Sequence, residues 1–440
     1  MNQFQLLKNN HFLPLFITQF LGAFNDNVYK NALIILIIFQ GSTLYGIDTN
    51  VLVTLSAGIF ILPMFLFSAT AGQIADKYEK SMLIRRVKIL EIVIMALAIF
   101  GFYFENIAIL ITLLFLMGAQ SALFGPLKYS ILPQHLSERE LTGGNGLIAM
   151  GTFLAILLGT IFGGVLISIE KFGPFIIACL VVVFAILGFF SSRFIPKAAA
   201  AEPELKINWN IASETVRVMQ YAMENRSVFI GVIAISWFWL LGATYLSQVP
   251  AYSKEILGSN NEVVTLLLTM FSVGIGIGSI MCEKLSKGHI ELGLVPLGAI
   301  GLTLFSIDIY FASEYFVSLS LPAGEMNFSQ FISISGSWRV LIDLVLIGLF
   351  GGFYTVPLSA MVQKRSNPLH RARVIAANNI LSALFMVISA IATVVLLQMG
   401  FSISQIFLGL GLLNLVVVGI LFILLPEFLQ RFIIFLGFRH

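Results

Sequence analysis

A small set of polar residues interrupts an apolar stretch near the N-terminus, residues 12–39. Asn25, Asp26 and Asn27 are followed by Lys30, four residues after the aspartate. At 1.5 Å per residue, Asp26 would lie roughly 20 Å along a helix, near the midplane of a hydrocarbon core about 30 Å thick. An ionisable group there costs at least ~2.5 kcal/mol and usually faces a protein interior or a water-filled path. Because residues four apart share a helix face, Asp26 and Lys30 form either a structural ion pair or a polar patch that lines a transport cavity.

The composition is that of a membrane protein. Of the 440 residues, 58% are apolar and 11% are Asp, Glu, Lys or Arg, against about 25% charged residues in soluble domains. Cys179 and Cys282 both lie in apolar stretches, so we expect neither a disulfide framework nor a Cys/His metal site. The N-terminal stretch has no small-residue cleavage site before the first span, and we expect a retained signal anchor.

Twelve predicted spans make the chain an all-α membrane protein with 12 transmembrane helices. Turn signals separate several spans, as at Gly125-Pro126 and Gly173-Pro174. Most of the 25 Lys and Arg residues, Lys88 included, fall in segments that are cytoplasmic if the N-terminus is inside, so the positive-inside rule predicts N-in/C-in. The spans cover about 12–39, 50–72, 82–104, 106–125, 144–169, 172–195, 227–251, 262–283, 291–312, 338–362, 373–400 and 402–425.

The domain organisation follows from a long cytoplasmic segment in the middle. Weak repeats run in the same direction through both parts of the chain, which predicts two parallel six-helix halves. Within the central linker, an amphipathic helix from Ile211 should lie at the membrane surface or bridge the halves. The predicted domains are an N-terminal bundle 1–195, a linker 196–226, a C-terminal bundle 227–425 and an amphipathic interfacial tail 426–440.

The segment after the second span combines a small residue, an aspartate and several basic residues. Gly72 lets a neighbouring helix come close, and Asp76 can sit at a helix N-terminus in the opposite half and pair with an arginine there. The second half has a degraded copy with Ser279 and Glu283, where we expect a weaker contact. Lys128 either completes this conformational latch or extends to lipid headgroups. The expected latch residues are Gly72, Asp76, Lys77, Lys80, Arg85, Lys128 and Glu283.

This loop resembles the signature loop of the major facilitator superfamily, in which such a contact closes the cytoplasmic side while the cavity faces outward. Residues 19–27, 124–133 and 141–164 are similar to bacterial lysophospholipid transporters. That family also forms the transporter portion of fusions with acyltransferase and acyl-carrier-protein synthetase domains. The chain departs from the family pattern by having Lys30 after the aspartate.

The resemblance implies a secondary transporter, or flippase, of the bacterial inner membrane. It would move lysophosphatidylethanolamine and lysophosphatidylglycerol to the cytoplasmic leaflet for reacylation, by alternating access with lateral lipid entry. Asp26 could bind an ammonium group and Lys30 a phosphate. For the asparagines outside the first span, hydrogen bonding between helices is the alternative. The candidate substrate-binding residues are Asn25, Asp26, Asn27, Lys30, Asn145, Tyr245, Gln248 and Asn378.

Two other functions remain open from the sequence: a proton-coupled exporter of amphipathic drugs or siderophores, and a membrane scaffold for an acyltransferase. No phosphate-binding loop, metal-ligand spacing or catalytic set occurs, so we expect no enzyme, cofactor, metal or nucleic-acid partner. The expected partners are the lysophospholipid, membrane lipids and a separate acyltransferase or acyl-carrier-protein synthetase, and the expected state is a monomer. Near the outer edge of the tenth span, Arg339 and Asp343 are four residues apart, and we expect them to pair.

Overall fold

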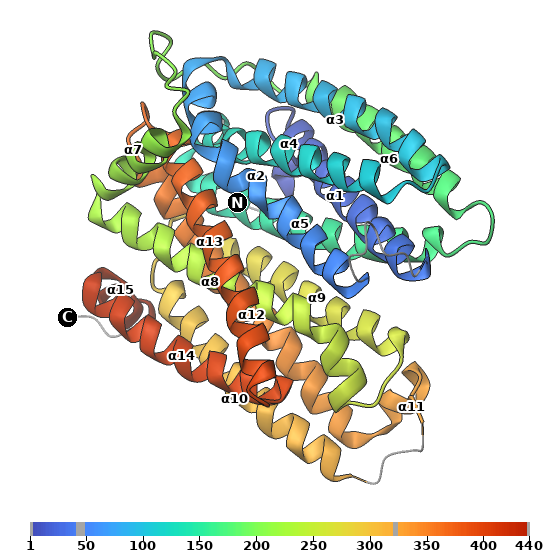
Figure 1. The fold of residues 1–440 in the computed structure, drawn as a ribbon. Helices are drawn as coiled ribbons and strands as arrows, with labels where there is room; N and C mark the ends of the chain where they lie inside the picture. The colour runs from blue at the N-terminus through green and yellow to red at the C-terminus, as the bar shows by residue number, and fades with distance from the viewer. Residues whose placement is uncertain (1–2, 41–48, 320–323, 438–440) are drawn as a thin grey trace.

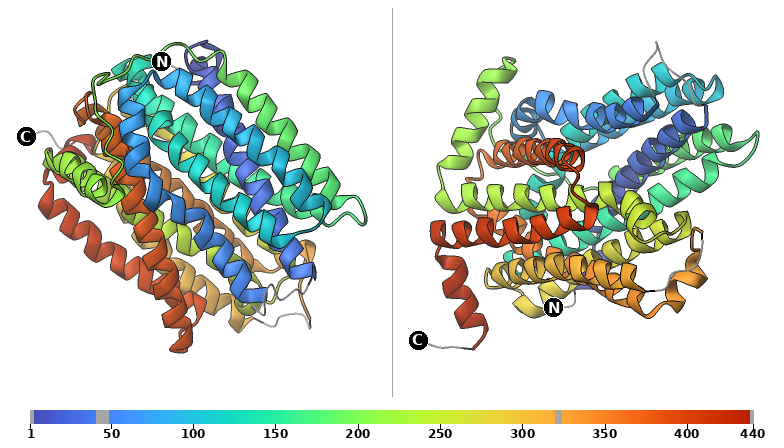
Figure 2. Two further views of the ribbon diagram at one scale, coloured as in Figure 1. Left: turned by 45° about the horizontal axis from the view of Figure 1, so that its top comes forward. Right: turned by 60° about the horizontal axis from the view of Figure 1, so that its bottom comes forward.

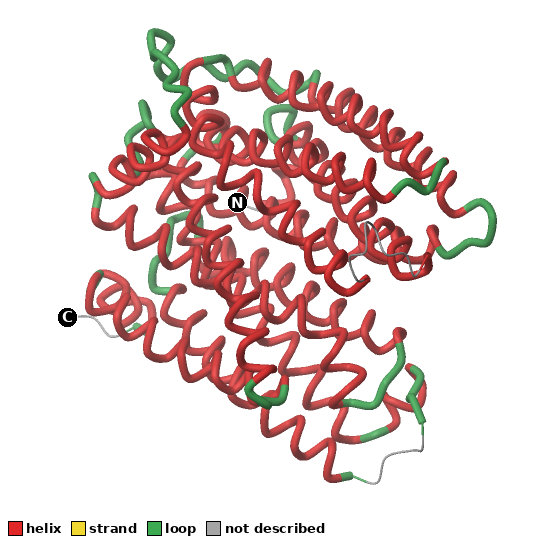
Figure 3. Tube along the Cα trace, in the orientation of Figure 1, coloured by secondary structure: helices red, strands yellow, loops and turns green. Residues whose placement is uncertain are grey.

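The structure is a computed structural model that describes residues 3–40, 49–319 and 324–437. Parts of the predicted N-terminal bundle, of the predicted C-terminal bundle and of the tail 426–440 lie outside these described residues. Within them the chain is helical without a β-strand, and mostly short loops join the helices (Figures 1 and 3). The predicted all-α class is confirmed.

Twelve of the described helices have 20 or more residues, in the order of the predicted spans. Those of the N-terminal half are α1 (Leu13–Gln40), α2 (Thr49–Lys77), α3 (Lys80–Tyr103), α4 (Ile107–His135), α5 (Glu138–Ile167) and α6 (Gly173–Ser192). Those of the C-terminal half are α8 (Arg226–Ala251), α9 (Asn261–Ser286), α10 (Leu294–Ser318), α12 (Ser335–Arg365), α13 (Arg371–Gln398) and α14 (Ile403–Leu424). The shorter elements are η1 (Gln3–Lys8), α7 (Ile211–Met223), η2 (Tyr252–Ile256), α11 (Phe328–Ser333) and α15 (Glu427–Phe435).

Ten of the described helices are long and apolar enough to cross a membrane, which makes the chain a multi-pass membrane protein. The helices α1 and α3 are not among these ten. Lys88 and Glu91 lie within α3, and such charged side chains lower a helix's mean hydropathy. The count of twelve spans and the N-in/C-in orientation therefore stay predictions.

The predicted turn at Gly125-Pro126 is wrong, because α4 continues through both residues to His135. Proline is tolerated inside a membrane helix where neighbouring groups satisfy the freed backbone. Gly125 also lies against Asn379 of α13, whose Nδ2 would be 2.6 Å from an added Cβ. Pro174, in contrast, lies at the start of α6, where its missing N–H has no intrahelical partner to lose.

Each half packs around its own apolar core, and the two sets of helices lie side by side (Figures 1 and 2). In the N-terminal half, α1 packs against α5 and α6. An added Cβ at Gly163 of α5 would come within 2.6 Å of the Val28 carbonyl oxygen on α1, so this close contact requires glycine. In the C-terminal half, α12 packs against α9 and α10. These contacts fix the helices that carry the charged residues described below.

The two short amphipathic helices lie at one end of the bundle. The helix α7 of the linker packs against α2, α8 and α13, so it touches both halves, with Val218 and Ala222 buried. The helix α15 packs against α10 and α14, with Phe428 buried and Leu429 and Ile434 exposed. An exposed apolar face beside the membrane-spanning helices suits an interfacial position.

Candidate functional site

A polar cluster lies inside the N-terminal half, around Asp26 of α1. Ser121 Oγ on α4 donates to Asp26 Oδ2 at 2.8 Å and lies 3.3 Å from Gln120 Oε1. Gln120 Nε2 donates to Glu91 Oε2 on α3 at 3.1 Å. Polar side chains thus connect three helices. We call this cluster the N-half network; its members are Asn25, Asp26, Lys88, Glu91, Gln120 and Ser121.

Glu91 is at the centre of the N-half network. Its Oε2 lies 2.6 Å from Lys88 Nζ, and both side chains are 1% exposed. Asn25 Nδ2 donates to Glu91 Oε1 at 3.2 Å and to the Val181 carbonyl oxygen of α6 at 3.1 Å. A carboxylate at membrane depth is tolerated when it has a cation and hydrogen-bond donors, and Glu91 has both. These contacts hold Asn25, and with it Asp26, in a defined position.

Asp26 is less completely satisfied than Glu91. It is half-buried, and no described residue forms a hydrogen bond with its Oδ1. Lys30 Nζ lies over the Phe60 ring, 5.2 Å from the centroid, and within the described part of the chain it forms no ion pair with Asp26. One turn of α1 therefore carries a buried carboxylate oxygen without a hydrogen-bond partner and an ammonium group that forms no ion pair with it.

Two of the other predicted substrate-binding residues are occupied in helix contacts. Asn27 Nδ2 donates to the Ala23 carbonyl oxygen of its own helix at 2.7 Å. Asn145 on α5 and Gln363 on α12 exchange amide hydrogen bonds of 2.9 and 2.8 Å. Asn145 thus joins the two halves, and the structure does not bring it to Asp26.

The remaining predicted substrate-binding residues belong to the C-terminal half. Tyr245 is buried, with its ring 4.6 Å from that of Phe407 between centroids. Gln248 Nε2 donates to Ser247 Oγ at 3.3 Å. Asn378 Oδ1 is buried and has no hydrogen-bond partner among the described residues. None of the three is in hydrogen-bond contact with the N-half network within the described chain, so their role in binding stays a prediction.

The two halves meet at the end of α2. Asp76 Oδ1 and Oδ2 accept from the backbone N–H groups of Ala372 and Arg373, each at 3.2 Å, at the start of α13. Arg373 Nε also donates to Asp76 Oδ2 at 3.1 Å. An added Cβ at Gly72 would lie 2.9 Å from Arg373 Cα, so glycine is needed for this approach. A carboxylate at a helix N-terminus, with a buried arginine, is a strong contact.

The central linker covers this contact. Arg373 Nη2 also binds Glu202 Oε2, and its guanidinium lies 4.8 Å from the centroid of the Tyr221 ring. Lys80 Nζ donates to the Ala199 carbonyl oxygen at 3.3 Å. In the same way, Arg85 Nη2 donates to the Ile195 carbonyl oxygen at 3.3 Å. Of the predicted latch residues, Lys80 therefore binds the linker and Arg85 binds the residue just before it, and neither forms a hydrogen bond with the opposite half within the described chain.

The other predicted latch residues lie elsewhere. Lys77 and Lys128 rest over the neighbouring rings of Tyr78 and Tyr129, at 5.6 and 4.6 Å from the centroids. Glu283, in the degraded copy, is buried at the end of α9. Its Oε2 would lie 3.2 Å from a Cβ added at Gly143 of α5, and no described residue forms a hydrogen bond with this oxygen. The second copy thus makes a similar contact between the halves, without an arginine.

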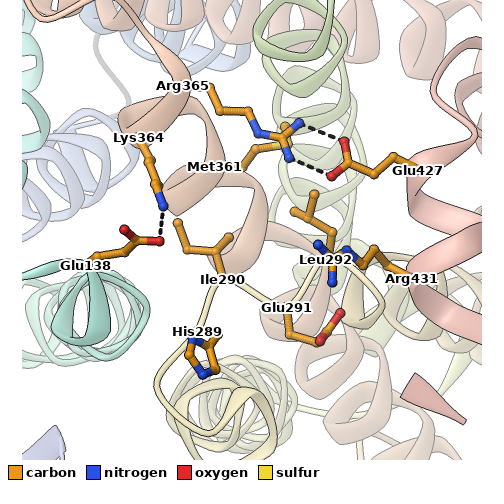
Figure 4. Close-up of a pocket in the computed structure, with 10 residues that line it drawn as sticks. All are labelled: Glu138, His289, Ile290, Glu291, Leu292, Met361, Lys364, Arg365, Glu427 and Arg431. Carbon is orange, nitrogen blue, oxygen red and sulfur yellow. Dashed lines mark hydrogen bonds and ion pairs between the residues drawn. The ribbon is translucent and has the colours of Figure 1, made fainter. Parts of the chain in front are cut away.

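A cavity of about 340 Å³ at the same end of the bundle lies between α5, α12 and α15 (Figure 4). Two of its basic side chains are paired: Lys364 binds Glu138 of the other half, and Arg365 binds Glu427 of α15 through two hydrogen bonds of 2.8 and 2.6 Å. The Arg365 hydrogen bond holds the pKa of Glu427 below its ordinary value. Contacts between the halves therefore close this end, which the positive-inside rule assigns to the cytoplasm.

The expected pair of Arg339 and Asp343 is wrong. Arg339 Nε and Nη2 donate instead to the two carboxylate oxygens of Asp308 on α10, at 3.0 and 2.5 Å. The packing of α10 on α12 brings Asp308 to the arginine, where the planar guanidinium can bind both oxygens at once. Asp343 is left buried, 2% exposed, and no described residue forms a hydrogen bond with its Oδ2. We call these three residues the C-half triad.

Sequence reasoning missed part of this chemistry. The charge distribution predicts a cytoplasmic position for Lys88, but this side chain is buried against Glu91. Glu91 lies well inside the predicted span 82–104, and a single acidic residue at that depth was the signal that could have found it. Gln120 and Ser121 gave no such signal, because neutral polar residues are common in membrane helices.

Comparison with known proteins agrees with this architecture. The family model described as Major Facilitator Superfamily matches residues 15–323. The structure is similar to the human organic anion transporter MFSD10 (TETRAN), with a TM-score of 0.72, 12% identity, and coverage of 93% of this chain and 98% of that one. It is also similar to the transporter FucP in its outward conformation, with a TM-score of 0.68, 14% identity, and coverage of 94% and 98%. The chain belongs to the major facilitator superfamily, as a multi-pass inner-membrane protein.

The proteins with similar sequences carry names that state a substrate. The chain is 28% identical over 354 residues to the lysophospholipid transporter LplT of Escherichia fergusonii, covering 79% of each protein. It is 26% identical over 387 residues to the lysophospholipid transporter LplT of Serratia proteamaculans, covering 85% of each. The family resemblance stated from the sequence is thereby confirmed.

Proposed function

We propose that the chain transports lysophospholipids, chiefly lysophosphatidylethanolamine and lysophosphatidylglycerol, from the outer to the cytoplasmic leaflet of the inner membrane. The observation that carries the proposal is the half-buried Asp26 with its unpartnered Oδ1, one helical turn from Lys30. The names of the relatives support the substrate class. Separate acyltransferases would then reacylate the product.

The headgroup contacts follow from the two unpaired charges on α1. The Asp26 carboxylate accepts hydrogen bonds from an ethanolamine ammonium, and the Lys30 ammonium binds the phosphate. The acyl chain already lies in lipid when the substrate enters sideways, so burying it gives little selectivity. Asn25, in this proposal, positions Asp26 through its bonds to Glu91 and Val181 and does not itself touch the headgroup.

Alternating access requires that the closed end can open. We propose that Asp76, Gly72 and the start of α13 form the latch of the cytoplasmic side, with Lys80 holding the linker over it and Arg85 holding the residue just before the linker. Release of the lipid to the cytoplasmic leaflet then requires separation of Asp76 from Arg373. The contacts of Asn145 with Gln363 and of Lys364 with Glu138 would break in the same step.

The test measures uptake of labelled lysophosphatidylethanolamine by proteoliposomes that contain the purified protein. Asp26→Asn keeps the size of the side chain and removes its charge, and we expect uptake to fall at least about tenfold, equivalent to about 1.4 kcal/mol. Glu170→Gln in the exposed loop before α6 is the matched control and should transport normally. Unchanged uptake in Asp26→Asn would refute the proposed site. Wild-type liposomes that move amphipathic drugs but no lysolipid would instead favour the exporter.

A further inference from the structure

The cavity between α5, α12 and α15 has charged walls that are only partly neutralised from within (Figure 4). Lys364 and Arg365 each pair with an acidic residue of the wall. Glu291 and Arg431 also line the cavity, but neither forms an ion pair with any residue that the structure describes. The cavity therefore has one carboxylate and one guanidinium left for an occupant.

These two unpaired groups are anchored at the same glycine. Glu291 lies in the loop between α9 and α10, and its Oε1 accepts from the Gly293 N–H at 2.9 Å. An added Cβ at Gly293 would lie 2.8 Å from the Arg431 carbonyl oxygen and 2.9 Å from Phe435 Cβ, so the loop and α15 are in direct contact there. The second carboxylate oxygen of Glu291 and the guanidinium of Arg431 thus come from two elements that meet at the cavity.

Apolar residues complete the cavity, and its size is that of a ligand site. Leu292 and Met361 line it and are buried, and Ile290 lies between the two ion pairs in Figure 4. The volume of about 340 Å³ falls within the range of about 300–1,000 Å³ that is common for small-molecule sites. A few polar groups on an apolar wall are what fixes the orientation of a ligand in such sites.

The position of the cavity indicates what can reach it. The helix α15 forms one wall and exposes Leu429 and Ile434 beside the membrane-spanning helices, which suits an interfacial position. Phospholipid headgroups are the charged groups that lie at this level. Arginine binds phosphate with two N–H groups, and a carboxylate accepts hydrogen bonds from a primary ammonium. A headgroup with one phosphate and one primary ammonium matches the two unpaired side chains.

We propose that this cavity binds the phosphoethanolamine headgroup of a phospholipid from the adjacent leaflet, with the phosphate on Arg431 and the ammonium on Glu291. A choline headgroup has no N–H to donate to Glu291, and a glycerol headgroup brings no cation to it. The cavity thus distinguishes phosphatidylethanolamine from phosphatidylcholine and phosphatidylglycerol. The inference goes beyond the proposed transport, because it concerns binding at a site that contains no residue of the N-half network.

The test counts lipids bound to the intact, full-length protein by native mass spectrometry in detergent. Equal amounts of the three phospholipids are added, and we expect phosphatidylethanolamine to bind in preference to the other two. Arg431→Gln should weaken its binding about fivefold, as expected for the loss of one exposed ion pair. Glu291→Gln should abolish the preference over phosphatidylcholine. The matched controls Arg193→Gln and Glu204→Gln, at exposed positions outside the cavity, should bind like the wild type.

Further measurements keep the outcome unambiguous. Arg431→Lys retains a cation for the phosphate and should keep most of the binding, which separates loss of charge from misfolding. Equal binding of all three lipids, a preference for phosphatidylglycerol, or wild-type selectivity in Glu291→Gln would overturn the proposal. Soluble glycerophosphoethanolamine that binds as tightly as the lipid would overturn it in favour of a site for a small metabolite. Asp26→Asn should bind phosphatidylethanolamine like the wild type, so failure of this site and failure of the transport site can be told apart.

Discussion

The two halves of the molecule balance their buried charges in different ways. In the N-half network the cation Lys88 is matched by Glu91, and hydrogen bonds from Asn25 and Gln120 complete that carboxylate. In the C-half triad Arg339 pairs with Asp308, and the buried Asp343 has no ion pair among the described residues. A buried ion pair with additional hydrogen-bond donors fixes the helices that carry it, whereas a buried carboxyl group without an ion pair does not. We therefore interpret the N-half network as the support of the proposed substrate site.

The largest effect is expected from removing the cation of the buried ion pair in the N-half network. Lys88→Met removes the ammonium group in contact with Glu91 and leaves a buried, unpaired carboxylate, which costs about 3–5 kcal/mol. The measurement is the free energy of unfolding of the purified protein in detergent, from a denaturant titration.

The matched control for this change is the double variant Lys88→Met with Glu91→Gln. It removes both charges and keeps a hydrogen-bonding side chain at position 91, so most of the lost stability should return. If the single variant unfolds like the wild type, the pair does not support the N-terminal half, and the contrast with the C-half triad disappears.

The sequence predicts these regions unequally, for physical reasons. Hydropathy alone predicts the long helices, and the Gly72–Asp76 motif predicts a carboxylate at a helix N-terminus of the other half. The motif does not identify Arg373 as the partner of the Asp76 carboxylate, because this pairing depends on how α2 and α13 pack. Asp308 illustrates the same limit: it is 31 residues from Arg339, and only the packing of α10 on α12 shows that it displaces Asp343.

An intermediate effect on the stability of the closed state is expected at the two copies of the contact between the halves, one at Asp76 and one at Glu283. Asp76→Asn weakens a carboxylate that accepts two backbone N–H groups and the Arg373 side chain. Loss of such charge-assisted bonds costs about 1.5–3 kcal/mol. Glu283→Gln affects a contact in which no arginine takes part, so its cost should be smaller. The ratio of closed to open protein should fall at least about tenfold in the first variant and less than about twofold in the second.

The population of the closed state can be measured by cross-linking. Cysteines replace Asn145 and Gln363, which are hydrogen-bonded between α5 and α12, in a chain whose Cys179 and Cys282 are changed to serine. A short bifunctional thiol reagent then captures the closed state, and its yield is compared between variants. An equal fall in yield for Asp76→Asn and Glu283→Gln would mean that the two copies contribute alike.

The smallest effect concerns a charged pair of the C-terminal half that lies outside the membrane. Because the hydrogen bond from Arg365 lowers the pKa of Glu427, the ionised pair holds α15 above the ordinary pKa of 4.5 and loses this contribution as the pH falls below it. Glu427→Gln should therefore speed hydrogen exchange of the α15 amides at neutral pH, and its difference from wild type should vanish once the pH falls below the lowered pKa of Glu427. Glu138→Gln breaks the neighbouring pair with Lys364 and should leave α15 unchanged. A difference between Glu427→Gln and wild type that persists in acid would mean that packing of Phe428, and not the charge, holds this helix.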